Sequence, residues 1–219
     1  AESFFFCRYL MFSEAYWHHT VRAVSAMVEG ALNDYVSRER PDKHELLSLL
    51  MSCSDDQLLD HLVSSSPEES TAAALLAGLT HYSRVPYKRL LTLNRQREDS
   101  LHHRAYDVIY KMNSASLAGL KKEIRENLAR VTGEKVPTTH LLVDTPPRDK
   151  DHMENVDMIF EGAGRREAVA LSSTSRVCAG IAWDFVKVVK KIRLFVHPQL
   201  AKSLPMNSDK LEKLLLETI

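Results

Sequence analysis

The chain has 219 residues, 44% of them hydrophobic, and its 29 basic and 29 acidic side chains cancel. This length allows one sizeable core or two small ones, and the balanced charge excludes the basic surface that attracts nucleic acid. Cys7, Cys53 and Cys178 lie far apart in sequence, which argues against a disulfide framework and favours a reducing compartment. No apolar run is long enough to span a bilayer, and the first residues lack the pattern of a signal peptide. We therefore expect a globular protein of the cytoplasm that contacts no membrane and no specific nucleic acid.

The first segment, residues 1–82, is predicted to be helical. Apolar residues surround the axis almost completely in the first part of residues 3–37, which predicts one long, mostly buried helix that ends before Pro41. Shorter helices are predicted at 43–51, at 57–64 after a capping box at 54–57, and up to about residue 81 after a cap at 66–69. Because the chain opens on an apolar helix without an initiating Met, we expect it to be part of a longer protein.

The remainder predicts an α+β subdomain over residues 83–204 and a terminal helix within 205–219. Leaving out an additional helix at 98–111, the elements follow the order β-α-β-β-α-β, which is typical of a small ferredoxin-like unit. The predicted elements are strands at 87–93, 140–144, 156–160 and 190–196, and helices at 114–131 and 173–186. Residues 162–166 predict a hairpin turn that carries two arginines, because a third glycine of a dinucleotide-binding loop is missing.

Three side chains in the first helix are candidate ligand contacts. Arg8, Phe12 and Tyr16 recur at every fourth position, so on a helix they lie along one face. An arginine can hold a phosphate through two hydrogen bonds, and a tyrosine can stack on a sugar or a base. The alternative interpretation is that Arg8 is a paired or snorkelling residue and that Tyr16 belongs to the core.

A second candidate lies where the helical segment meets the first predicted strand. Arg84, Lys88 and Arg89 are interleaved there with aromatic residues, and cations with aromatics at a domain junction can hold a polyphosphate. The alternative is a solvated basic edge that protects a strand from mispairing.

The sequence contains no catalytic or metal-binding motif. The adjacent pairs His18-His19 and His102-His103 point about 100° apart on a helix, so neither pair chelates one ion. No histidine is followed by aspartate, and neither the serine run at 172–175 nor a cysteine has the frame of a nucleophile. Residues 144–151 are polar and carry two prolines, which favours a solvated loop. We therefore assign no catalytic residue and no metal ligand in this chain.

These segments and this element order resemble the C-terminal half of HD-domain phosphohydrolases. The nearest branch is the deoxynucleoside triphosphate triphosphohydrolases, which include the SAM-and-HD-domain enzymes. The similarity covers roughly residues 4–204, and its two short motifs are Arg8-Tyr9-Leu10-Met11-Phe12-(x3)-Tyr16-Trp17-His18-His19-Thr20-Val21-Arg22-Ala23 and Arg84-Val85-Pro86-Tyr87-Lys88-Arg89.

The resemblance implies roles for five residues. Arg8 would lie near a substrate phosphate and Tyr16 against the sugar, with Phe12 where some members have a histidine. Arg84 and Lys88 would bind the phosphates of an activating nucleotide at an oligomer interface.

The resemblance also implies what the chain lacks. The metal ligands of the family precede the helix with which this chain begins, so a divalent metal is expected only in an upstream HD core, and this chain alone should not hydrolyse nucleotides. The expected function is the C-terminal portion of a metal-dependent phosphohydrolase acting on (deoxy)nucleotides or related phosphoesters, which contributes substrate-pocket and oligomer contacts. The expected partners are the HD core, further copies of the chain and a nucleotide. The alternative is a non-catalytic interaction or oligomerisation module.

Overall fold

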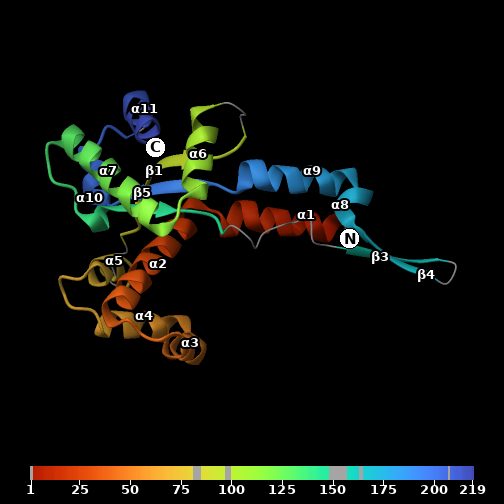
Figure 1. The fold of residues 1–219 in the computed structure, drawn as a ribbon, viewed down its shortest axis with the longest axis horizontal. Coiled ribbons are helices and arrows are strands. Elements are labelled where there is room, and N and C mark those ends of the chain that lie inside the picture. The colour runs from red at the N-terminus through yellow and green to blue at the C-terminus, as the bar shows by residue number, and fades with distance from the viewer. Residues whose placement is uncertain (1, 81–84, 97–99, 148–156, 163–164, 207) are drawn as a thin grey trace.

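The computed structural model describes the whole chain except residues 1, 81–84, 97–99, 148–156, 163–164 and 207. A body built around a small sheet carries a helical lobe and a long two-helix arm (Figure 1). The first part comprises α1 (Glu2–Leu10), the π-helical segment η1 (Met11–Tyr16), α2 (His19–Glu39), α3 (Lys43–Ser52), α4 (Asp55–Ser64) and α5 (Thr71–Thr80). The second part comprises β1 (Lys88–Leu93), α6 (Leu101–Lys111), α7 (Ser114–Thr132), η2 (Thr138–His140), β2 (Leu141–Asp144), β3 (Asp157–Gly162), β4 (Arg165–Ala170), α8 (Leu171–Thr174), α9 (Arg176–Asp184), η3 (Phe185–Val189), β5 (Ile192–Val196), α10 (Pro198–Ser203) and α11 (Asp209–Thr218).

The α+β class is confirmed, but the ferredoxin-like strand order is wrong. The main sheet has the order β1-β5-β2 and is antiparallel throughout, whereas β3 pairs only with β4 in a separate hairpin. The hairpin itself is as predicted. The segment after β2 begins with Pro146 and Pro147, which cannot donate ladder hydrogen bonds. The hairpin of β3 and β4 lies at the far end of the arm, away from β1, β5 and β2 (Figure 1).

The two faces of the main sheet are covered by different helices. One face packs against α6, α7, α10 and α11 through a core that includes Leu194 and Val196 of β5. The other face packs against α2, α4 and α5 through a core that includes Phe195. Successive residues of β5 therefore alternate between two cores, and all five are buried.

The arm joins the two ends of the fold. The first helix, α1, and η1 run beside α8, α9 and η3, and buried residues of both halves form a third apolar cluster. The Phe12 and Phe185 rings meet edge to face with centroids 5.4 Å apart, and the Tyr9 hydroxyl donates to Asp184. Burial and the Asp184 contact raise the pKa of Tyr9 to about 12. The predicted division of the chain at residue 82 stays a prediction.

The single helix predicted for residues 3–37 is wrong, because the helix is interrupted at Trp17 and His18. The Trp17 N–H donates to the Phe12 carbonyl at 2.9 Å and closes the π-helical turn. The backbone of His18 is then extended, and its imidazole Nδ1 accepts from the Thr20 N–H as the N-cap of α2. No proline or glycine marks this break in the sequence, so local signals could not predict it.

The shorter helices follow their predicted caps more closely. The capping box at Ser54 is confirmed, with the Ser54 hydroxyl accepting from Gln57 N–H. The predicted start of the next helix is wrong: α5 begins at Thr71, and the Ser70 hydroxyl accepts from the Ala73 N–H. Near the middle of α2, a Cβ on Gly30 would lie 2.7 Å from Leu75, so glycine lets α2 and α5 approach closely.

Candidate functional site

The three predicted ligand-contact residues of the arm do lie together. The Arg8 guanidinium carbon is 5.7 Å from the Phe12 ring centroid, and the Phe12 and Tyr16 rings meet edge to face at 5.3 Å. Arg8 is exposed and Tyr16 is 53% exposed, while Phe12 is half-buried against α9 and η3. A core role for Tyr16 is therefore excluded. What these side chains bind is not shown.

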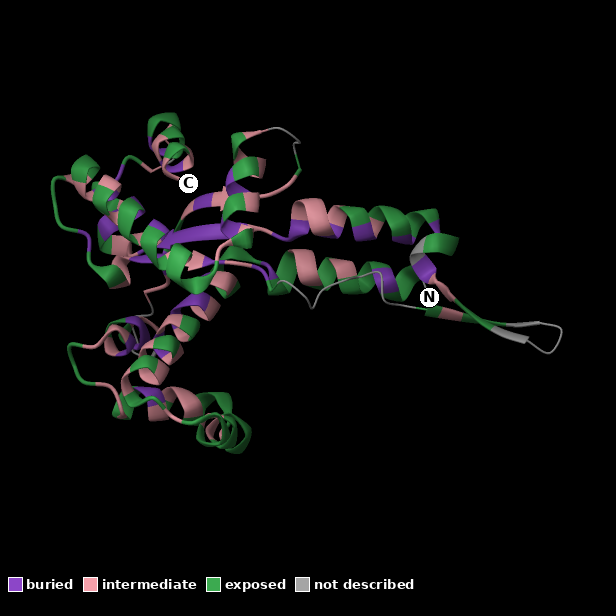
Figure 2. Cartoon of the chain, in the orientation of Figure 1, coloured by how far each residue is buried: buried purple, intermediate pink, exposed green. Residues whose placement is uncertain are grey.

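The outer face of the arm is unusually apolar. Phe5 packs inward, but residues on the other sides of α1 and η1 face solvent, and α9 adds exposed side chains of its own (Figure 2). A helix that is apolar all round is normally buried, and a large exposed apolar patch marks an interaction surface. The exposed apolar residues of the arm are Phe4, Phe6, Leu10, Met11, Tyr16, Val177 and Trp183.

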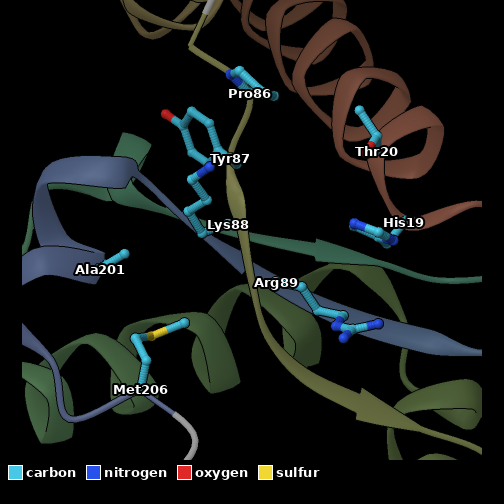
Figure 3. Close-up of a pocket in the computed structure, with 8 residues that line it drawn as sticks. All are labelled: His19, Thr20, Pro86, Tyr87, Lys88, Arg89, Ala201 and Met206. Atoms are coloured by element: carbon cyan, nitrogen blue, oxygen red, sulfur yellow. The ribbon is translucent and has the colours of Figure 1, made fainter.

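A cavity of about 360 Å³ lies where α2 begins and β1 starts. The residues that line it are His19, Thr20, Pro86, Tyr87, Lys88, Arg89, Ala201 and Met206 (Figure 3). Tyr87 is buried and its hydroxyl donates to the Thr139 carbonyl at 2.7 Å, which fixes one wall, whereas Lys88 and Arg89 are exposed. Of the predicted pair Arg84 and Lys88, only Lys88 can be located beside the cavity. Arg84 lies outside the described residues.

A buried ionic cluster that the sequence did not predict lies where β2 pairs with β5. Asp144, expected in a solvated loop, is the buried last residue of β2. Both of its carboxylate oxygens accept from the Arg22 guanidinium, with Nε to Oδ2 at 3.0 Å. Arg193 of β5 lies directly opposite Asp144 in the sheet, and its Nη1 is 4.0 Å from Oδ2. A charged residue within the apolar run of β5 was the available signal.

The charges around the cavity are predominantly positive. Burial lowers the pKa of Arg193 to about 10; Asp144 opposes this shift, and Arg22 and Arg89 add to it. Burial also lowers the pKa of His19, helped by the charges of His18, Arg89 and Arg193. Arg89 therefore acts on both Arg193 and His19, so the cations near the start of α2 repel one another.

The described residues were compared with the requirements for a metal cluster and for a membrane-spanning helix. Among those residues, no three His, Cys, Asp or Glu side chains lie close enough together to hold a metal ion. No helix in the same part of the chain combines the length and the apolar character needed to cross a membrane.

A comparison with known protein families identifies the family of this chain. The family described as the HD associated region matches residues 1–182, which is most of the chain. The protein therefore belongs to the HD associated region family, a region found with HD domains. No curated protein matches the chain.

Proposed function

We propose that this chain is the accessory region of an HD-domain phosphohydrolase, and that the arm packs against the HD domain at its substrate pocket. The observation that carries the proposal is the apolar outer face of α1 and η1, which is exposed although its composition is that of a buried helix. The family match supports an HD domain as the partner that covers this face.

The side chains on the arm supply the contacts that such a pocket needs. An exposed guanidinium at Arg8 can donate two parallel hydrogen bonds to a phosphate. The Tyr16 ring, held edge to face against Phe12, offers a flat surface to a sugar or a base. In this proposal the HD domain holds the divalent metal, which supplies activated water when bound, and the arm orients a (deoxy)nucleotide or a related phosphoester.

A regulatory role is a second part of this proposal. Lys88 is exposed and lines the cavity beside α2, where it could contact the phosphates of a nucleotide. The resemblance adds Arg84 and an oligomer interface to this site. Oligomer contacts and nucleotide binding remain proposals, as does the alternative of a purely structural interaction module.

The test uses the protein that carries this chain together with its HD domain. Leu10→Glu and Phe6→Glu place a charge on the outer face of α1, and Met51→Glu, on the exposed end of α3, is the matched control. Burying an unpaired carboxylate is strongly unfavourable, so we expect both arm variants, but not the control, to lose at least tenfold in phosphohydrolase activity.

A second readout does not depend on activity. Cys7 is exposed on α1, Cys53 is half-buried and Cys178 is buried, so alkylation of native protein reports on the arm when the modified peptide that contains Cys7 is followed by mass spectrometry. We expect Cys7 to react rapidly in the isolated chain and slowly when the HD domain is present. Equal rates in both proteins, with full activity of the arm variants, would show that the HD domain does not cover this face.

A further inference from the structure

We propose that Arg193 is a positioning residue, which binds the Trp17 carbonyl, fixes the break between η1 and α2 and thereby sets the direction of the Tyr16 side chain. The inference rests on the proposed function, because it treats Tyr16 as a contact to the substrate. Arg193 itself makes no contact with substrate in this role, since it lies on β5 in the main sheet and acts through the backbone of Trp17.

The break is a defined piece of backbone. The Trp17 N–H donates to the Phe12 carbonyl at 2.9 Å, five residues back, which is the hydrogen bond of a π-helix. The next residue, His18, is extended and serves as the N-cap of α2. A π-turn holds one residue more than an α-turn, and one residue corresponds to about 100° of rotation on a helix. This turn therefore sets the angle between Arg8 and Tyr16 around the axis of the arm.

Two arginines hold Trp17 in this position. The Arg193 Nη2 donates to the Trp17 carbonyl at 2.5 Å, and the Arg22 guanidinium carbon lies 5.0 Å from the centroid of the Trp17 ring. Both partners of the hydrogen bond are only 4% exposed, and burial strengthens such a bond. Asp144 connects the two arginines, because its carboxylate accepts from Arg22 and lies 4.0 Å from the Arg193 Nη1. The backbone and the ring of Trp17 are thus both tied to the main sheet.

The sheet gives Arg193 a rigid base. Arg193 lies directly opposite Asp144 in the pairing of β2 with β5, and opposite Thr92 in the pairing of β1 with β5. The strand β5 is central in the sheet, and all five of its residues are buried. A group that projects from such a strand is held more precisely than one on a loop. The contact therefore fixes Trp17 relative to the best-packed part of the fold.

Stability alone does not explain a buried arginine in this strand. The rest of β5 is apolar, and burial lowers the pKa of Arg193 to about 10, which reflects the cost of burying its charge. Asp144 already has both oxygens engaged by Arg22, and the Arg193 Nε and Nη1 have no hydrogen-bond partner among the described residues. Apolar residues of similar size often replace buried charges without loss of stability. What the arginine adds is a directed hydrogen bond to Trp17.

The position of Trp17 reaches Tyr16 in two ways. Tyr16 precedes Trp17 in the chain, and its ring meets the Phe12 ring edge to face at 5.3 Å. Phe12 is held in turn, because its carbonyl accepts from the Trp17 N–H and its ring packs on Phe185 at 5.4 Å. Once released from Arg193, the Trp17 carbonyl can accept from the N–H four residues later, as in a continuous α-helix. Tyr16 would then turn out of line with Phe12.

The first experiment measures whether Arg193 holds the break in the 219-residue chain. Arg193→Met removes the hydrogen bond and keeps most of the side-chain volume. Arg95→Met is the matched control, because Arg95 also pairs with an aspartate and lies over an aromatic ring, but does not touch the junction. The Cα chemical shift of His18, measured by NMR, distinguishes an extended from a helical backbone. We expect it to move toward the helical value in Arg193→Met alone.

A second variant keeps this test valid, because Arg193→Met can also unfold the chain. Arg193→Lys retains the positive charge beside Asp144, but its ammonium stops one bond short of the arginine Nη2, and it lacks the planar fork. We expect a smaller movement of the His18 shift in the same direction. An unchanged His18 shift in every folded Arg193 variant, or an equal movement in Arg95→Met, would overturn the proposal.

The second experiment measures whether Arg193 acts through Tyr16, in the protein that carries the HD domain. Arg193→Met and Tyr16→Ala are compared singly and together, with Arg95→Met again as the control. We expect each single variant to lower kcat/KM at least tenfold and the double variant to be no worse than Tyr16→Ala, because residues that act as a unit are not additive. A merely structural role for Arg193 predicts losses that multiply, and this result would contradict the proposal.

The two experiments separate this inference from the proposed function. Full activity in Arg193→Met, beside an impaired Tyr16→Ala, would refute the positioning role and leave the substrate contact intact. Full activity in Tyr16→Ala would refute the substrate contact. The His18 chemical shift, measured without the HD domain, decides independently whether Arg193 holds the break.

Discussion

The ionic cluster at the sheet predicts a large loss of stability when its single carboxylate is removed. Asp144→Asn keeps the size of the side chain but removes its charge, so the Arg22 and Arg193 guanidiniums face each other without their nearest counter-ion. Breaking a buried ion pair costs about 3–5 kcal/mol, because an uncompensated charge stays behind. The asparagine oxygen can still accept one hydrogen bond from Arg22, so we expect about 3 kcal/mol. For a chain of this size this lowers the melting temperature by about 6–12 °C.

The matched control is a carboxylate of similar contacts but greater exposure. Asp107 accepts from Arg95 at 2.7 Å, and its side chain is 33% exposed. Pairs of this kind contribute about 0–1 kcal/mol, so Asp107→Asn should change little. Urea unfolding followed by circular dichroism gives both free energies. Losses in the two variants that agree within about 0.5 kcal/mol would refute the description of Asp144 as the counter-ion of a buried cluster.

Two further predictions concern the arm and a histidine pair. With the HD domain present, Arg8→Ala should lower kcat/KM about ten- to a hundredfold, and Tyr16→Phe should lower it less. Both variants should keep the melting temperature of the natural protein, because the two side chains are exposed. Full activity in a destabilised Arg8→Ala protein would contradict this prediction. The rings of His140 and His197 stack with their centroids 4.4 Å apart, and burial lowers the pKa of both imidazoles. The neutral imidazoles therefore stabilise the fold above about pH 6.5, which is the pKa of histidine in the unfolded chain. This stabilisation is lost as the pH falls below that value. His197→Asn can keep the N-cap of α10 and should flatten the pH dependence of the melting temperature between pH 7.5 and 5.5; an unchanged slope would exclude this pair as its source.

Features that depend on neighbouring residues could be predicted from the sequence. The capping box at Ser54 and the apolar stripe of α7, with Leu120, Ile124 and Leu128 buried, follow from spacing alone. The row of Arg8, Phe12 and Tyr16 has the same origin, because residues four apart on a helix are neighbours and Phe12 contacts both of the others.

Features that depend on distant partners could not be predicted. Nothing local says that β2 pairs with β5 rather than with β3, because strand pairing is decided by the whole sheet. The break at Trp17 is of the same kind, since its carbonyl bonds to Arg193, 176 residues later. Asp144 looked like a loop residue because its partners, Arg22 and Arg193, are remote in sequence.

The break at Trp17 separates the arm from the cavity beside α2. In an unbroken helix the Trp17 carbonyl would accept from residue 21, and Arg193 would lose the hydrogen bond that it donates to Trp17. The break instead ends η1 after Tyr16 and starts α2 at His19, so that one side of the junction leads into the arm and the other side forms the cavity. The arm therefore presents apolar surface and Arg8, while the new helix N-terminus adds its dipole to the buried cations. A single buried arginine, which comes from the far end of the chain, thus bonds to the point at which the arm ends and α2 begins.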